Sequence, residues 1–491
     1  MSVAEARGAD PSPGWAGLGR WLGPALFVLV LVAPTGALQG DAKRVAAATL
    51  WMAVWWVTEA APLAATSMLP LVLFPLLEVR RVSAVAPNYA DHIIFLFLGG
   101  FVLALAVERS GLHRRLALAV LTNVGASPRR LVWGFLIATA VLSMWLSNTA
   151  TALMMLPIAG GVATRVGHPG TPTRLFLAVA YGASVGGIGT LVGTPPNLVL
   201  AGMAPSLVPD LPPLTFGQWM LFGVPLVIIF LPVVGLLLSR GLPRRVAADP
   251  GLREERARLG AMGVRERRVA ALFALTALAW VTRSDLSFGV VTVPGWSSLL
   301  PDPKLVSDAV PAVAAALLAT LLPAGENGGR RLLSWDEIRH GVPWGVLLLF
   351  GGGFALADAV HASGLEGWLA DSLHGLSVLP LPLIVLSICL ITTFATELTS
   401  NTATATLLMP VLAALAGVLA VPPYLLMVPA TVSASCAFML PVATPPNAIV
   451  IGSGHVSTQD LFRAGIWLNL VGAVVITCLV LTLGQLVLPL T

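Results

Sequence analysis

The chain has 491 residues, of which 57% are apolar and only 10% are charged, with a net charge of +5 and a mean hydropathy of +0.88. A soluble domain carries about 25% charged residues and a bilayer core is crossed by ~20 apolar residues, so the composition excludes a soluble globular protein and indicates a polytopic membrane protein. The three cysteines lie in apolar runs without CxxC spacing, which indicates neither a disulfide framework nor a zinc site.

Apolar runs follow one another along the whole chain. They lie near 21–39, 45–60, 62–78, 91–108, 131–163, 174–203, 215–239, 269–283, 307–323, 343–361, 379–417, 423–453 and 462–489. Runs 131–163 and 379–417 contain Ser-Asn-Thr clusters and are interpreted as re-entrant hairpins, because loop backbone at membrane depth needs protein or a water-filled cavity around it. We therefore expect an all-α polytopic membrane protein of about eleven transmembrane helices plus two re-entrant hairpins.

Positive charge predicts the orientation in the membrane. Segment 240–268 carries nine arginines and four acidic residues. Nucleic-acid binding is one interpretation of such a stretch, but a cytoplasmic loop is far better supported in a membrane protein. With segment 240–268 in the cytoplasm, most of the 28 Lys and Arg residues of the chain fall on the cytoplasmic side of the membrane. We expect a multi-pass protein of the cell inner (plasma) membrane, with a cytoplasmic N-terminus, the C-terminus outside and no nucleic-acid partner.

An internal repeat organises the chain. Three motifs recur 253 residues apart and one recurs 250 residues apart: GF at 100–101 and 353–354, SGL at 110–112 and 363–365, SNTAT at 147–151 and 400–404, and TPPN at 194–197 and 444–447. Each copy contains five spans, an odd number, so the second copy enters the membrane from the opposite side. Two inverted repeats are the usual architecture of secondary transporters, with a site near the bilayer midplane.

Each repeat places neutral polar groups at membrane depth. Ser143 precedes Ser147 by four residues, and Thr396 precedes Ser400 by the same spacing, so the two hydroxyls of each pair share a helix face. The paired prolines of each TPPN motif remove N–H donors and leave carbonyls without partners. Hydroxyl, amide and carbonyl oxygens suit a small hard monovalent cation, and no carboxylate cluster suited to calcium or magnesium is present.

The same breaks also suit an anion. Half-helices begin there, and their free N–H groups favour negative charge. Since no Lys or Arg lies near the middle of any span, an anionic substrate would be held by Asn148, Thr149, Asn401, Thr402 and helix N-termini, with bound cations supplying charge. Packing residues bonded within their own helix are the alternative interpretation, which two copies at a fixed offset disfavour.

Three acidic residues are predicted at membrane depth, namely Glu59, Asp358 and Glu397. Glu397 stands where the first repeat has Met144, so it breaks the repeat symmetry. Two roles remain open for it: a buried structural acceptor or a protonatable coupling group. Glu59 is expected to cap or bond a neighbouring helix.

The chain resembles the divalent anion sodium symporter (DASS) family of dicarboxylate, citrate and sulfate transporters from Trp51 onward. Five motifs carry the resemblance: WWVTEAAPLAATSMLP (55–70), SNTATALMMLP (147–157), GTPPN (193–197), TELTSNTATATLLMP (396–410) and ATPPN (443–447). The resemblance implies a homodimer with a scaffold domain and a moving transport domain, and Na+ as the co-transported ion.

The resemblance also implies the roles of individual residues. It places one sodium site at Ser143, Ser147, Asn148 and Gly193, a second at Thr396, Thr399, Asn401 and Ala443, and substrate carboxylates at Asn148, Thr149, Asn401, Thr402, Pro196 and Thr444.

The expected division of the chain follows from the repeat and the resemblance. It comprises an N-terminal segment and first helix (1–44), scaffold helices with an interfacial arm (45–126), a transport part (127–239), a basic cytoplasmic loop (240–268), a second scaffold part with its arm (269–378) and a second transport part (379–491). We expect sodium-coupled symport of a C4 dicarboxylate, or a related divalent anion, into the cell by an elevator movement. The alternative is a sodium-independent dicarboxylate or anion exchanger of the same family. No enzyme motif such as HExxH is present, and an enzyme is not expected.

Overall fold

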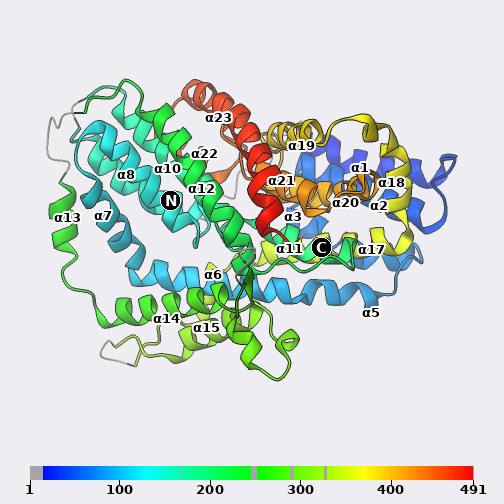
Figure 1. The fold of residues 1–491 in the computed structure, drawn as a ribbon, viewed down its shortest axis with the longest axis horizontal. Coiled ribbons are helices and arrows are strands. Elements are labelled where there is room, and N and C mark those ends of the chain that lie inside the picture. Colours follow the sequence, from blue (N-terminus) through cyan, green and yellow to red (C-terminus); the bar gives the residue numbers. More distant parts are fainter. Residues whose placement is uncertain (1–14, 167, 245–250, 288–291, 326–328, 490–491) are drawn as a thin grey trace.

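The computed structural model describes residues 15–166, 168–244, 251–287, 292–325 and 329–489. Within these ranges the chain is almost entirely helical (Figure 1). The one ladder in the described chain pairs β1 (Leu286–Ser287) with β2 (Thr292–Val293), with Leu286 opposite Val293. The prediction of an all-α polytopic architecture is confirmed.

The first repeat runs from the N-terminal helices to α12. Its elements are α1 (Trp15–Val32), α2 (Gly40–Thr58), α3 (Leu63–Thr66), α4 (Leu69–Leu76), α5 (Val82–Val85), η2 (Ala86–Ala90), α6 (His92–Ser110), α7 (Leu112–Val124), α8 (Pro128–Ser143), α9 (Asn148–Ala163), α10 (Thr171–Gly187), α11 (Pro195–Leu207) and α12 (Phe216–Ser239). The amphipathic α7 stands where an interfacial arm is predicted, between the SGL motif and the first hairpin.

The second repeat follows a short helix in the basic segment. Its elements, with that helix first, are α13 (Leu252–Arg258), α14 (Val264–Val281), η3 (Trp296–Leu299), η4 (Pro303–Leu305), α15 (Ala309–Leu321), α16 (Trp335–Gly341), α17 (Trp344–Ser363), α18 (Leu365–Leu373), η5 (His374–Val378), α19 (Leu381–Thr396), α20 (Asn401–Leu419), α21 (Tyr424–Ala434), α22 (Pro445–Gly452), α23 (Thr458–Leu479), η6 (Val480–Gly484) and α24 (Gln485–Val487).

Six helices of the described chain are long and apolar enough to cross a bilayer by themselves. They are Trp15–Val32, Val82–Ser110, Phe216–Ser239, Trp344–Ser363, Asn401–Leu419 and Thr458–Val487. A bent pair, Leu365–Val378 with Leu381–Thr396 at 120°, is a seventh candidate. Among the remaining expected spans, α2 and α14 are unbroken helices of 19 and 18 residues that begin with groups of charged residues. The others are short helices or are broken at polar residues and prolines.

The interruptions fall at the Ser-Asn-Thr and TPPN motifs. In the hairpins, α8 ends at Ser143 and α9 begins at Asn148, while α19 ends at Thr396 and α20 begins at Asn401. The spans that follow are also broken, between α10 and α11 and between α21 and α22. Both α11 and α22 begin with two prolines, whose fixed φ suits the first turn of a helix and whose missing N–H costs nothing there.

The two repeats meet at α6 and α17. Phe97 and Phe350 stand 253 residues apart, at equivalent positions of the two helices, and their ring centroids are 4.7 Å apart. Equivalent residues touch each other only next to a symmetry axis, so the pseudo-two-fold axis passes between these rings.

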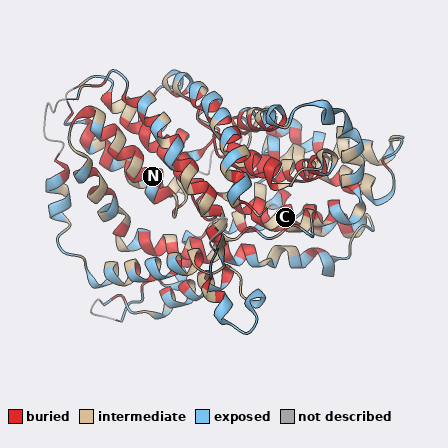
Figure 2. Ribbon diagram, viewed as in Figure 1, coloured by how far each residue is buried: buried red, intermediate tan, exposed pale blue. Residues whose placement is uncertain are grey.

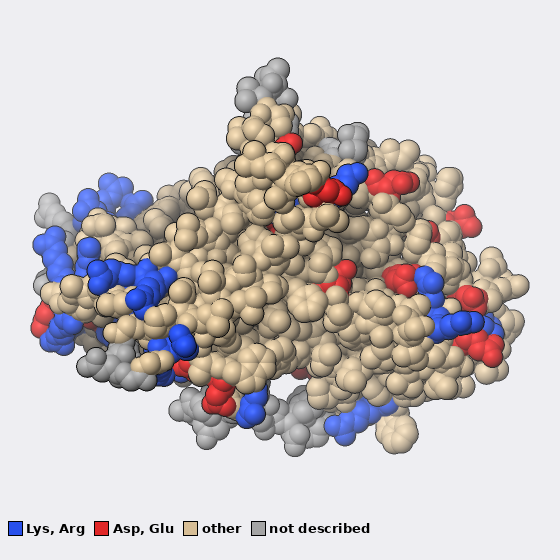
Figure 3. All heavy atoms as spheres, turned by 90° about the horizontal axis from the view of Figure 1, so that it is seen from below, with Lys and Arg blue, Asp and Glu red and all other residues tan. Residues whose placement is uncertain are grey.

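Burial and charge agree with a membrane protein. Figure 2 shows buried residues concentrated in the interior helices, and every residue of α21 is buried. On the face drawn in Figure 3, the densest group of Lys and Arg side chains gathers at one end of the long axis, the end that α7 and α13 form in Figure 1. Helix α1, in contrast, exposes most of its surface.

Candidate substrate and cation site

The first oxygen cluster forms at the tip of the first hairpin. The Ser143 hydroxyl oxygen lies 2.8 Å from Asn148 Oδ1 and 2.7 Å from the Ala183 carbonyl oxygen of α10. A hydroxyl carries one proton, so it donates to only one of these acceptors at a time. Three oxygens from three segments therefore converge with fewer protons than acceptors, which is a surrounding suited to a cation.

The second cluster repeats the first. The Thr396 hydroxyl oxygen lies 2.7 Å from Asn401 Oδ1 and 2.9 Å from the Ala434 carbonyl oxygen of α21. Hydroxyl, amide and carbonyl take the same places as in the first cluster. The structure thus brings together Ser143 with Asn148, and Thr396 with Asn401. The prediction that Ser143 and Ser147, and Thr396 and Ser400, share a helix face is wrong, because α8 ends at Ser143 and α19 ends at Thr396.

Glycines bring the backbone of the first broken helix against Asn148. A Cβ atom on Gly187 would lie 2.5 Å from Asn148 Oδ1 and 3.1 Å from the Gly193 carbonyl oxygen. A Cβ atom on Gly193 would overlap the Gly187 carbonyl. Gly193 therefore adjoins the first cluster. The equivalent residues of the second repeat are Ala437 and Ala443, both buried.

The asparagines of the TPPN motifs hold the two unwound segments in shape. Asn197 Nδ2 donates to the carbonyls of Gly187 (3.2 Å) and Thr190 (2.7 Å), and Asn447 Nδ2 donates to those of Ala437 (3.1 Å) and Leu440 (3.0 Å). Sequence reasoning treated these asparagines only as part of a helix break. Asn197 and Asn447 recur at the same 250-residue offset as the two TPPN breaks, and this recurrence is the sequence signal that indicates their structural role.

The remaining predicted ligands have different surroundings. The Ser147 hydroxyl caps α9 by accepting from the Ala150 N–H at 3.2 Å. The Thr399 hydroxyl donates to the Ala395 carbonyl at 3.0 Å and lies 2.5 Å from the Thr404 hydroxyl. Neither contact joins the Thr399 hydroxyl to the second cluster. The main-chain carbonyl of Thr399 is therefore the group through which this residue could bind a cation.

The predicted substrate ligands line the starts of the half-helices. Thr149 and Thr402 occupy the first turns of α9 and α20, and neither side-chain hydroxyl is hydrogen-bonded within the described chain. Pro196 and Thr444 are buried at the two TPPN breaks. The repeats are joined here, because the Ser435 hydroxyl lies 3.4 Å from that of Thr194.

The electrostatics of this region come from the backbone. Segments 143–150, 187–197, 396–404 and 434–447 contain no Lys or Arg, while α9, α11, α20 and α22 all begin within them. The starts of α9 and α20 offer free N–H groups and about half a positive charge each. Helices α11 and α22 begin with two prolines, and the N–H groups of Asn197 and Asn447 that follow are bonded to the Thr194 and Thr444 carbonyls. The described chain also has no group of three or more His, Cys, Asp or Glu placed to hold a metal. The arrangement can therefore bind carboxylates at helix N-termini and a monovalent cation at neutral oxygens.

Glu397 ties the second hairpin to the second broken helix. Its carboxylate accepts from the N–H groups of Phe438 (2.8 Å), Met439 (2.9 Å) and Leu440 (2.9 Å), and from Asn469 Nδ2 of α23 (2.8 Å). Four donors and no acceptor surround the two oxygens, so the carboxylate serves as the acceptor for three consecutive backbone N–H groups and one side-chain amide. This geometry favours the structural acceptor over the coupling group.

The two other acids at membrane depth lie outside these clusters. Asp358 of α17 forms an ion pair with Arg80 at 2.9 Å. Glu59 follows the last residue of α2 and adopts a left-handed conformation (φ 48°), so it ends that helix through its backbone. Asp358 and Arg80 connect the two repeats within the helices that we expect to form the scaffold.

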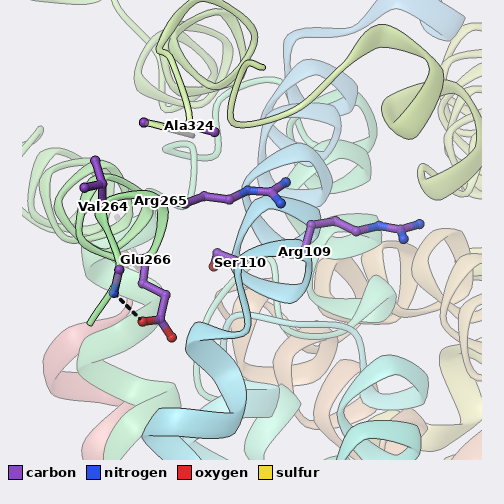
Figure 4. Close-up of a pocket in the computed structure, with 8 residues that line it drawn as sticks. Arg109, Ser110, Val264, Arg265, Glu266 and Ala324 are labelled. Carbon is purple, nitrogen blue, oxygen red and sulfur yellow. Dashed lines mark hydrogen bonds between the residues drawn. The ribbon is translucent and has the colours of Figure 1, made fainter. Parts of the chain in front are cut away.

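A separate hollow of about 340 Å³ lies where α6 ends and α14 begins (Figure 4). Arg109, Ser110, Val264, Arg265 and Glu266 line it, and Figure 4 shows the Arg109 side chain pointing away from Val264. The Arg265 guanidinium donates to the Leu332 carbonyl at 2.7 Å, and Glu266 pairs with Arg115 at 3.0 Å. Both charged groups are thus engaged by partners outside the hollow, and neither belongs to the two clusters.

Two inverted repeats, each with a polar hairpin tip facing a broken helix, define the protein as a secondary transporter of the membrane. The chain belongs to the family described as the sodium:sulfate symporter transmembrane region, whose model matches residues 19–490. The recognition of the DASS family from the motifs is thereby confirmed.

Curated relatives agree with this assignment, and two solved structures share the fold. The chain is 41% identical to the sodium-dependent dicarboxylate transporter SdcS of Staphylococcus saprophyticus over 481 residues (94% of this chain and 90% of the relative), and 39% identical to SdcS of Staphylococcus aureus at the same coverage. Its fold is similar to that of the YdaH transporter of Alcanivorax borkumensis (TM-score 0.58, 17% identity, 82% and 88% of the two chains). It is also similar to that of Neisseria gonorrhoeae MtrF (TM-score 0.56, 14% identity, 81% and 82%).

Proposed function

We propose that the protein imports a C4 dicarboxylate together with sodium across the plasma membrane. The observation that carries this proposal is the repeated cluster of hydroxyl, amide and carbonyl oxygens, Ser143–Asn148–Ala183 and Thr396–Asn401–Ala434. Neutral oxygens of this kind suit Na+. The names of the SdcS relatives support both the ion and the substrate class.

The ligands are assigned by repeat. Sodium site 1 comprises Ser143, Ser147, Asn148 and Gly193, sodium site 2 comprises Thr396, Thr399, Asn401 and Ala443, and the substrate carboxylates are bound by Asn148, Thr149, Asn401, Thr402, Pro196 and Thr444. Each asparagine then serves both ligands, its Oδ1 facing the cation and its Nδ2 facing a carboxylate. The bound cations supply the positive charge that the side chains of the site lack.

Energetics require a driving ion. Moving a dianion into a cell that is negative inside costs about 4.6 kcal/mol per 100 mV, since each elementary charge costs ~2.3 kcal/mol. Coupling to more than two sodium ions reverses the sign of the transferred charge, so the membrane potential then assists uptake. The transport cycle is therefore expected to carry net positive charge inward.

Movement of the site completes the proposed mechanism. Segments 131–203 and 379–453 move as one unit across the membrane, while 45–108 and 269–361 remain in a scaffold that dimerises with a second copy. Helices α7 and α18 connect the two parts as hinged arms. The arginine-rich composition of segment 240–268 supports an orientation with the N-terminus in the cytoplasm and the C-terminus outside.

Uptake by purified protein in proteoliposomes tests the coupling. We expect concentrative succinate uptake that stops when choline replaces sodium and that increases with an inside-negative potential. Undiminished uptake in choline would contradict symport. Malate, fumarate, citrate and sulfate as competitors identify the preferred anion.

Sodium-independent exchange is the second candidate. The position of the Thr399 hydroxyl favours it, because this group is turned to Ala395 and Thr404 and leaves the second cation cluster with fewer side-chain oxygens. Counterflow of labelled succinate in sodium-free buffer distinguishes the two candidates, since an exchanger sustains it and a symporter does not.

A further inference from the structure

A pair of glycines marks equivalent positions of α6 and α17, and the two members of each pair face different neighbours. Cβ atoms on Gly99 and Gly352 would overlap backbone atoms of Ala312 and Ser67, inside the bundle that we expect to be the scaffold. Gly100 and Gly353 are turned toward the hairpins and broken helices instead. The second glycine of each pair therefore lies at the boundary between the fixed and the moving parts.

The unwound segment of the first repeat rests on Gly100. A Cβ atom built on Gly100 lies 3.1 Å from Val192 Cγ1 and 3.5 Å from Val192 Cβ. Val192 immediately precedes the GTPPN motif and is 9% exposed. Contact at this distance leaves no room for a larger residue at position 100 unless Val192 shifts.

The equivalent contact is absent from the second repeat. Val442 precedes the ATPPN motif as Val192 precedes GTPPN, yet its side chain is 77% exposed. Gly353 faces Thr406 of α20 and not Val442. A Cβ atom built on Gly353 lies 3.0 Å from Thr406 Cγ2. The counterpart of Thr406 in the first repeat is Leu153, which is 39% exposed.

A second pair of equivalent glycines shows the same asymmetry. A Cβ atom on Gly202 of α11 would overlap the ring of Phe354 on α17, whereas Gly452 of α22 is exposed and has open space around it. By the repeat, the partner of Gly452 would be Phe101 of α6. In the described structure the contacts of Gly100 with Val192 and of Gly202 with Phe354 are therefore formed. The symmetry-related contacts, Gly353 with Val442 and Gly452 with Phe101, are not formed.

We propose that Gly100 and Gly353 are the two stops of the transport movement, so that Val192 rests on Gly100 in the present state and Val442 rests on Gly353 in the oppositely open state. In the oppositely open state, each repeat would adopt the conformation that the other repeat has in this structure. Each contact seen here would then be replaced by the contact between the equivalent residues of the other repeat. The same exchange brings Leu153 to Gly100 and Gly452 to Phe101. This inference rests on the proposed transport function and adds to it the residues at which each excursion ends.

Two cysteine pairs test the stops. The background replaces Cys389, Cys436 and Cys478 with alanine and must retain uptake. The first pair is Gly100→Cys with Val192→Cys, whose Cβ separation of 3.5 Å falls in the range of about 3.5–4.5 Å found in disulfides. The second pair is Gly353→Cys with Val442→Cys. Both are oxidised in proteoliposomes during turnover, and the disulfides are identified by peptide mass spectrometry.

We expect both pairs to form disulfides, each abolishing uptake, and a reducing agent to restore at least half of the initial rate. The link between 353 and 442 must form only while the protein cycles, so removing the co-ion and substrate changes its yield relative to that of the first link. The inference is overturned if the second pair stays reduced while the first is oxidised in actively transporting protein. It is equally overturned if uptake continues with either link closed.

A matched control keeps the same exposed cysteine and moves its partner to Gly160. Gly160 has open space around it and lies twelve residues beyond the start of α9, about 18 Å along the helix. The pair Gly160→Cys with Val442→Cys should stay reduced and transport normally. Uptake by the reduced variants with sodium or choline tests the proposed coupling separately, so its failure is distinguishable from failure of the stops.

Discussion

Asn148 and Asn401 each present two different atoms to the site. In both residues Oδ1 accepts from the hydroxyl five residues earlier, across the hairpin tip, at 2.8 Å and 2.7 Å, while Nδ2 has no hydrogen-bond partner within the described chain. An amide is the neutral side chain that can face a cation with one atom and an anion with the other. This explains how one residue type recurs at both clusters.

Removing either amide should weaken the binding of sodium and of the substrate together. For Asn148→Ala and Asn401→Ala we expect the apparent affinities for sodium and succinate each to fall roughly ten- to a hundredfold, since a hydrogen bond to a charged group contributes about 1.5–3 kcal/mol. Linkage requires the paired effect, because a cation that helps bind the anion is itself bound more tightly when the anion is present. Binding titrations of each ligand at several concentrations of the other measure it. Exposed Asn123→Ala is the control, and normal binding with lost transport would make the amides structural.

Substituting Glu397 should affect stability more than coupling. Glu397→Gln turns one acceptor oxygen into a donor facing backbone N–H groups, which should cost about 2–3 kcal/mol and lower the thermal unfolding midpoint. Glu108→Gln, at an exposed position of α6, should leave the midpoint unchanged. A Glu397→Gln protein of normal stability whose uptake has lost its pH dependence would instead identify a protonatable coupling group.

At this scale the side chains of the two oxygen clusters were predictable from sequence, and the carbonyls of the clusters were not. The Ser-Asn-Thr motifs indicated Ser143, Asn148, Thr396 and Asn401 because their residue types carry the chemistry. The carbonyls of Ala183 and Ala434 complete the clusters, yet a backbone oxygen is common to every residue and has no sequence signature. Only the packing of α10 and α21 against the hairpins selects them.

At the scale of elements, the last helix of each repeat closes on the unwound segment through a glycine. A Cβ atom on Gly223 of α12 would lie 2.8 Å from the Ile188 carbonyl oxygen, and one on Gly465 of α23 would overlap that of Phe438. Ile188 and Phe438 are equivalent residues of the two broken helices. The close approach fixes the backbone that lies beside each cluster.

Adding a methyl group at this approach should disturb the site. Gly465→Ala forces α23 away from Phe438, and we expect a loss of about 1–3 kcal/mol in stability, typical of an overpacked contact, together with weaker substrate binding. Gly417→Ala, at an exposed position of α20 with open space around it, provides the control. Equal behaviour of the two variants in thermal unfolding and binding assays would show that the approach is unimportant.

Polar residues and prolines in the sequence predicted where the helices are interrupted. The sequence did not predict how long each helix is. The hairpin tips and the helix starts at Pro195 and Pro445 lie at the predicted interruptions. Stretches such as Leu63–Leu76 and Ala309–Leu321 are apolar throughout but form short helices. Hydropathy measures the solvent that a segment prefers, whereas the length of its helix depends on the neighbours that it packs against.

At the scale of the molecule, the arm α7 is anchored to the segment between the repeats. Arg115 donates to Glu266 at 3.0 Å and to the carbonyls of Gly260 (2.8 Å) and Leu259 (3.2 Å). Its side chain is 18% exposed. Its neighbour Arg114 makes one ion pair, with Glu255, and is far more exposed.

Releasing this anchor should slow transport without weakening binding. If α7 transmits movement between the scaffold and the first hairpin, Arg115→Ala should lower the maximal uptake rate several-fold at unchanged KM, because the arm loses its fixed end. Arg114→Ala should behave like the parent protein. Initial rates over a range of succinate concentrations separate the two parameters, and a raised KM with unchanged maximal rate would place the effect at the site instead.

The contact between Phe97 and Phe350 has a consequence for the balance between the two open directions. Exchange of the repeats maps this contact onto itself, so the energy of the contact between the two rings is the same in both conformations and does not contribute to their ratio. Off-axis differences, such as Leu153 opposite Thr406, do not cancel in this way. The preference for one direction is therefore encoded in the mismatches between the two halves of the sequence, and evolution can retune it without altering the axis.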